Sequence, residues 1–125
     1  MRRAILAFED APEPSLVEAQ LLGTIMICPY LRLDCGSLRP SDFSTSHRGA
    51  AFEAIMATKH PEIGLVVAHL EQRKVSAPPG CTGWGDALSR CLDVTFVEDD
   101  AVPDAVRAIK EAAIQRRIDR RQRVL

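Results

Sequence analysis

Apolar residues first recur at helical spacing shortly after the N-terminus. Leu22 and Ile25 lie three residues apart on one helical face, and Pro29 must end the run. Ser15 stands three residues before Glu18, which is the spacing of a capping box at a helix start. The pattern predicts a helix from Ser15 to Pro29 with one buried face.

Similar apolar spacing recurs along the rest of the chain, so further helices are expected. They are predicted to follow Ser46, to begin near Ile63, to begin near Trp84 and to begin near Pro103. Three consecutive acidic residues at 98–100 precede Pro103, and both the negative charge and the proline suit the first turn of a helix. The mixture of apolar pairs with Gly, Pro and Ser over residues 29–46 predicts one or two single turns.

The sequence therefore predicts an all-α fold, a compact bundle of about five to six short helices with a longer basic C-terminal helix. No stretch alternates with the period of two that a strand requires. Gly23 lies inside the first helix, where glycine lowers stability, and we interpret it as a site of close packing. With 125 residues, the chain suits one domain at 15–125, preceded by a flexible N-terminal extension at 1–14.

Charge is unevenly distributed, although the whole chain has a formal net charge of only -1. Residues 103–125 hold seven Lys or Arg residues against three acidic ones, so this segment carries +4 and the remainder -5. The basic side chains suit the C-terminal end of a helix dipole. They also suit a phosphate backbone or the charged surface of a protein partner.

No motif for nucleotide binding or hydrolysis occurs in the chain. The sequence contains no G-x-x-x-x-G-K-[ST], no GxGxxG and no GxSxG, so it predicts neither an ATP site nor a nucleophile elbow. The three histidines and four cysteines lack the spacing of zinc ligands, and we expect no metal and no cofactor. The hypothesis that the chain is an enzyme requires a catalytic site formed by Asp42 and His47.

The chain shows no signal peptide and no membrane span. The apolar stretch before Glu9 and Asp10 is too short for the core of a signal peptide. No apolar run approaches the roughly 20 residues that cross a bilayer. We therefore expect a cytoplasmic protein with reduced thiols, in which Cys28, Cys35 and Cys91 pack as small hydrophobes.

Two runs of residues form motifs. EAQLLG spans residues 18–23, and LRPSDFSTSHRGAAFEAI spans residues 38–55. They resemble the N-terminal domain of the DnaB-type replicative DNA helicase family, with its E-A-E-Q-x-x-L-G opening, its L-x-P-x-D-F and its H-R-x-I-F-x-A-I. The matching positions of the second run are Leu38, Pro40, Asp42, Phe43, His47, Arg48, Phe52, Ala54 and Ile55. IGLVVAHLEQRK, GWGDALSRCLDV and VRAIKEAAIQRRI resemble the later helices, so the likeness runs from Pro14 to about Arg120.

The resemblance implies a helical domain that builds a collar by pairing through a helical hairpin and that receives primase or loader proteins. In the family a second hairpin helix, a linker and an ATP-hydrolysing motor domain follow, and this sequence does not contain them. The chain departs from the pattern at residues 60–64 and in the loop that carries Pro78 and Pro79. If the chain is a fragment, its parent is expected to be an ATP-dependent DNA helicase.

The last helix is the expected contact surface. Four apolar residues spaced by four, three and four form a narrow seam, which we expect to be partly exposed because its hairpin mate is missing. The residues expected to contact a partner or a second copy are Val102, Val106, Ile109, Ala113, Arg116, Arg117 and Arg120.

The leading hypothesis is a non-catalytic protein-interaction domain of DNA replication, either part of a helicase or a stand-alone relative of one. Its expected partners are a helicase, a primase or a loader, together with self-association. The alternative is a small DNA-binding regulator whose basic last helix contacts phosphates, with nucleic acid bound weakly.

Overall fold

The computed structural model describes residues 14–96, 98 and 100–124. All regular elements in this part of the chain are helical, which confirms the predicted all-α fold. The elements are α2 (Pro14–Ile27), η1 (Pro29–Cys35), η2 (Pro40–Asp42), α3 (Ser46–Ala57), α4 (Ile63–Gln72), α5 (Trp84–Leu92) and α6 (Ala101–Val124), where η marks a 3₁₀ helix. The expected flexible extension at residues 1–14 lies outside the described residues, except that Pro14 is the first residue of α2.

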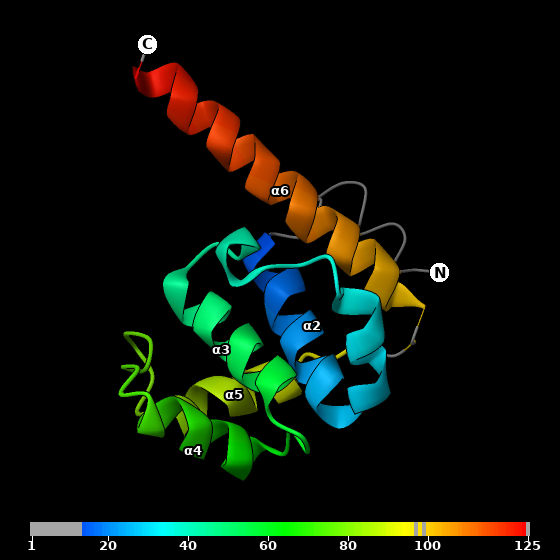
Figure 1. The fold of residues 1–125 in the computed structure, drawn as a ribbon, viewed down its shortest axis with the longest axis vertical. Helices are drawn as coiled ribbons and strands as arrows, with labels where there is room; N and C mark the ends of the chain where they lie inside the picture. Colours follow the sequence, from blue (N-terminus) through cyan, green and yellow to red (C-terminus); the bar gives the residue numbers. More distant parts are fainter. Residues whose placement is uncertain (1–13, 97, 99, 125) are drawn as a thin grey trace.

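Helix α2 is the centre of the bundle. It contacts α3, α5, α6 and η1, while α4 packs on α3 and α5 at the far side (Figure 1). Leu21, Leu22 and Ile25 of α2 are almost completely buried, as their helical spacing requires. The core therefore surrounds α2, and the other helices cover it.

The backbones of α2 and α5 approach each other closely at Gly23. A Cβ atom added there would lie 2.2 Å from the carbonyl oxygen of Cys91 and 2.8 Å from Cγ2 of Thr95. The prediction that Gly23 serves close packing is confirmed. Next to it, the hydroxyl of Thr24 accepts a hydrogen bond of 2.9 Å from the backbone N–H of Phe96, which ties the chain after α5 to α2.

Polar side chains fix both ends of α3. Thr45 is the N-cap, and its hydroxyl accepts a hydrogen bond of 3.1 Å from the N–H of Arg48. At the other end, the Arg32 guanidinium donates to the carbonyl oxygens of Ile55 (2.9 Å) and Thr58 (2.7 Å). A cation that satisfies terminal carbonyls also suits the helix dipole, so Arg32 joins η1 to the end of α3.

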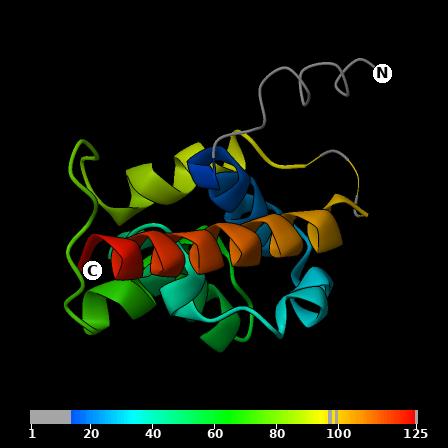
Figure 2. The same cartoon turned by 90° about the horizontal axis from the view of Figure 1, so that it is seen from above.

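Helix α6 has 24 residues, and its last turns project beyond the rest of the bundle (Figure 1). Figure 2 shows α6 lying across the other helices. It begins at Ala101, two residues before the predicted Pro103. Proline is tolerated there because the first N–H groups of a helix have no intrahelical acceptor. Within the described residues, no helix is long and apolar enough to span a membrane.

Candidate partner surface on α6

The apolar seam of α6 faces the body of the protein. Val102, Ile109 and Ala113 are 0%, 1% and 2% exposed, and Val106 is 8% exposed. The expectation that this seam would be partly exposed is therefore wrong. The physical reason is that α6 lies across α2, η1 and η2, and the seam is the side that closes the core over them.

Two of the arginines expected to contact a partner bind Asp42 instead. Nη2 of Arg117 lies 3.2 Å from Oδ1 of Asp42, and Nη2 of Arg116 donates to the Asp42 carbonyl oxygen at 2.7 Å. Nζ of Lys110 reaches Oδ2 of Asp42 at 3.3 Å and the carbonyl oxygen of Ser37 at 2.7 Å. These basic side chains clamp α6 onto the segment between η1 and α3.

The electrostatics of this clamp favour an ionised Asp42. Burial alone raises the pKa of this carboxyl group, because the charged form loses its hydration. The N–H of Arg39, at 2.9 Å from Oδ2, and the cations Lys110 and Arg117 outweigh burial and hold the Asp42 pKa below its ordinary value. Asp42 is thus a buried anion that anchors the C-terminal helix.

A second buried acid, Glu18, joins α2 to the start of α3. Its side chain accepts hydrogen bonds of 2.8 Å from both the N–H and the hydroxyl of Ser44, and it pairs with Arg48 at 3.3 Å. Arg48 also donates to the carbonyl oxygen of Ser15. The predicted capping box between Ser15 and Glu18 is therefore wrong, because α2 already begins at Pro14 and Glu18 points to a distant segment.

The outward side of α6 carries two exposed isoleucines. Ile114 is 51% exposed and Ile118 is 42% exposed, and their spacing of four places them on one helical face. They follow Ala113 by one and five residues, so at about 100° per residue they lie well away from the buried seam. Sequence periodicity missed this pair because the seam gave the stronger apolar pattern.

Charged residues flank the isoleucine pair on the same face of α6. Glu111 is exposed one turn before Ile114, and Arg121 is exposed one turn after Ile118. Arg120 and Arg123 are also exposed, but at about 100° per residue they lie on other sides of α6. Unlike Arg116 and Arg117, Arg120 makes no hydrogen bond or ion pair with the described residues of the body. The outward face of α6 is thus an apolar patch with charges at both ends.

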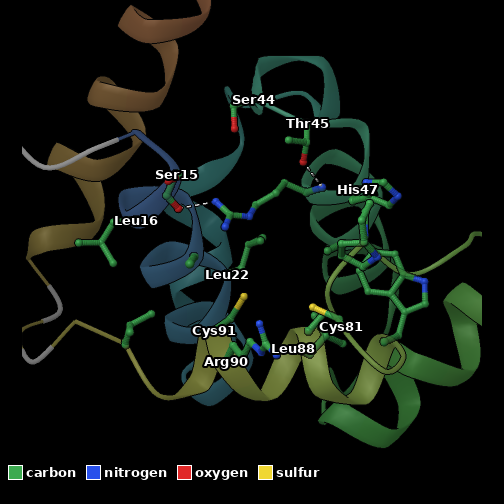
Figure 3. Close-up of a pocket in the computed structure, with 18 residues that line it drawn as sticks. Ser15, Leu16, Leu22, Ser44, Thr45, His47, Cys81, Leu88, Arg90 and Cys91 are labelled. Carbon is green, nitrogen blue, oxygen red and sulfur yellow. Dashed lines mark hydrogen bonds between the residues drawn. The ribbon is translucent and has the colours of Figure 1, made fainter.

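A pocket of about 570 Å³ lies on another side of the molecule, between the start of α2, α3 and α5 (Figure 3). The buried Leu22 and Leu88 lie at its base, and Cys81 and Trp84 are part of its wall. Trp84 is a core residue, as predicted, and its indole N–H donates to the carbonyl oxygen of Val75 at 2.8 Å. The pocket is therefore apolar at its base and formed by three helices and a loop.

The structure does not bring the proposed Asp42 and His47 pair together. His47 lines the pocket, where its ring centroid lies 6.3 Å from that of Trp84, whereas Asp42 is not among the lining residues. The Asp42 carboxylate faces Lys110 and Arg117 of α6. A catalytic site formed by these two residues does not fit this arrangement.

The four cysteines are free thiols. Burial, with a smaller effect from the negative charge of Asp34, raises the pKa of Cys35 to about 11, and burial also raises the pKa of Cys91. Since the thiolate is the reactive form, these two side chains behave as small core hydrophobes, as predicted. Within the described residues, no group of three His, Cys, Asp or Glu side chains could hold a metal ion.

Comparison with known proteins identifies the fold of the chain through one solved structure. No protein-family model matches the chain, and no curated protein matches it. Among solved structures, the N-terminal domain of DnaB helicase from Mycobacterium tuberculosis is similar, with a TM-score of 0.74 and 20% sequence identity. The similarity covers 84% of this chain and 76% of that one. The chain therefore has the fold of a DnaB helicase N-terminal domain, as its motifs predicted.

Proposed function

We propose that this chain is a non-catalytic protein-interaction domain of the DNA replication machinery. The fold, shared with a DnaB helicase N-terminal domain, supports the assignment to replication. The observation that carries the interaction role is the exposed pair Ile114 and Ile118 on the projecting part of α6, where the neighbouring exposed residues are polar or charged. Exposed apolar residues rimmed by polar ones are typical of protein contact sites.

The charge pattern of α6 also suits pairing with a second copy. In an antiparallel pair centred at residue 116, Ile114 of one copy faces Ile118 of the other. The same register places the exposed Glu111 opposite Arg121 of the second copy. A twofold axis repeats both contacts, and the two bodies lie on opposite sides of the paired helices.

The size of this contact determines which partner is favoured. Each isoleucine is already half-buried, so pairing adds roughly half of the 1.5–3 kcal/mol that full burial provides. Four such side chains give about 3–6 kcal/mol, against an association cost of about 4–15 kcal/mol. Self-association through this patch alone is therefore weak, and a replicative helicase, primase or loader that covers more surface is the favoured partner.

The test is direct binding to purified partners. Calorimetry of the full chain against the cognate helicase, primase and loader should identify a partner, and Ile118→Asp should weaken that binding at least about tenfold. Arg123→Gln is the matched control, since it makes the same change in net charge on another side of α6. Unchanged binding by the Ile118→Asp variant would remove the outward face of α6 from the proposal.

A further inference from the structure

Two thiols, those of Cys81 and Cys91, line the pocket between α2, α3 and α5. Cys81 belongs to the loop before α5, and Cys91 belongs to the last turn of that helix. Figure 3 shows both sulfur atoms on the same side of α5, directed toward the space between the helices. Cys81 is half-buried whereas Cys91 is only 8% exposed, so a small oxidant in solution reaches the loop thiol more easily.

The loop before α5 folds back along that helix. Nη2 of Arg90 donates a hydrogen bond of 3.4 Å to the carbonyl oxygen of Gly80. Gly80 and Arg90 are the chain neighbours of Cys81 and Cys91. The contact therefore brings the loop thiol to the end of α5 that carries the second thiol.

The Cys91 thiol makes no hydrogen bond with the described residues, although it is more than nine-tenths buried. By contrast, Sγ of Cys35, which is also buried, donates to the carbonyl oxygen of Leu31 at 3.8 Å. Burial raises the pKa of Cys91, the Arg48 guanidinium lowers it, and negative charge on Cys81 raises it again. Cys91 is thus a buried thiol without a hydrogen-bond partner that faces the pocket and lies within electrostatic reach of Cys81.

We infer that Cys81 and Cys91 form a reversible dithiol–disulfide pair at this pocket. With oxidised glutathione as the oxidant, the Cys81 thiolate attacks one sulfur atom and releases one glutathione molecule. Cys91 then loses its proton and attacks the Cys81 sulfur of the mixed disulfide, which releases the second glutathione molecule. Two protein thiols are oxidised, one glutathione disulfide is reduced to two thiols, and these thiols take up the two protons.

The loop has the freedom that closure of this bond requires. A disulfide places its two Cα atoms about 4.4–6.8 Å apart. Gly80, next to Cys81, has a φ of 86°, a conformation open to glycine, and an added Cβ there meets nothing within 4 Å. The Arg90 hydrogen bond to Gly80 is long and exposed, so it restrains the loop weakly. Oxidation then fixes the loop on the last turn of α5, and the redox state sets the width of the pocket.

The inference is independent of the proposed function, because no pocket residue belongs to α6. The test equilibrates the full chain with reduced and oxidised glutathione. After an acid quench, the remaining thiols are alkylated in denaturant, and linked peptides are mapped by mass spectrometry without reduction. The expected product is a monomer with a link from Cys81 to Cys91, in which Cys28 and Cys35 are alkylated. The effective concentration of the linked pair should be at least about tenfold higher in the folded chain than in urea.

Two variants test the order of the steps and the choice of cysteines. Cys91→Ser should stop at a mixed disulfide of Cys81 with glutathione. Cys28→Ser is the matched control, because Cys28 is also half-buried but does not line the pocket, and it should leave the link unchanged. Absence of the link in the unmodified chain would overturn the inference. An equal effective concentration in the folded and unfolded chain would also overturn it, since a spacing of ten residues would then explain the link without the fold.

Discussion

Arg117 and Asp42 stand 75 residues apart in the sequence, yet Nη2 of the arginine lies 3.2 Å from Oδ1 of the aspartate. Asp42 is the D of the L-x-P-x-D-F motif, and Arg117 lies in the segment that resembles the last helix of the family. Glu18, the first residue of the EAQLLG run, and Arg48, which follows His47 in the second run, form another ion pair between distant segments. The charged motif residues therefore hold distant segments of the bundle together.

Replacing Asp42 by Asn should destabilise the protein by about 1–3 kcal/mol, because Lys110 and Arg117 lose their anion while the amide stays buried. Urea unfolding at neutral pH measures the change. Asp104→Asn is the matched control, since it removes the same charge from an exposed ion pair with Arg107 and should cost less than about 0.5 kcal/mol. An equal loss in both variants would contradict a special role for the Asp42 clamp.

The contribution of Asp42 should also depend on pH. Because the folded protein lowers the pKa of this group, its ionised form stabilises the fold above the pKa of the unfolded chain. That stability is lost as the pH falls through the lower pKa of the folded state. The difference in unfolding free energy between the unmodified chain and Asp42→Asn should therefore shrink below about pH 4. A difference that stays constant from pH 7 to pH 3 would mean that charge does not carry the effect.

Gly23→Ala should destabilise the protein by a few kcal/mol, although alanine is the better helix former by about 1 kcal/mol. The added methyl group would collide with the carbonyl of Cys91, and backbone cannot move aside as a flexible side chain can. Gly64→Ala in α4 is the control, because an added Cβ there meets nothing within 4 Å. Thermal unfolding should show a lower Tm for the first variant and an unchanged or higher Tm for the second.

Local periodicity predicted the helices well because most of them bury a single face. Helix α2 is the exception to its prediction of one buried face, since residues 21–26 are all buried by the elements around it. The expected ends at Pro29 and the starts near Ile63 and Trp84 match α2, α4 and α5. The exposure of the α6 seam was predicted wrongly for a related reason. A narrow apolar stripe shows which side of a helix is buried, but it does not show whether the body of the same chain or a partner buries it.

Long-range polar contacts could not be predicted from spacing. Glu18 stands three residues after Ser15, and this local pattern suggested a capping box, while the true donors lie on Ser44. Nothing in the sequence near Arg116 indicates that it donates to the carbonyl of Asp42. The pocket likewise arises from three helices and the loop at residues 78–81, which come together only in the folded chain.

The alternative function, a DNA-binding regulator, makes a quantitative prediction about salt. Of the arginines near the end of α6, Arg116 and Arg117 are bound to Asp42, and Arg120, Arg121 and Arg123 remain exposed. Each phosphate neutralised contributes about 0.9 to the slope of log affinity against log salt, so three arginines support a slope of at most about -3 on duplex DNA. Fluorescence anisotropy with a labelled duplex at two salt concentrations measures it. A clearly steeper slope, lost in the triple Arg→Gln variant, would favour DNA over a protein partner, whereas a shallow slope leaves the isoleucine face of α6 as the contact surface.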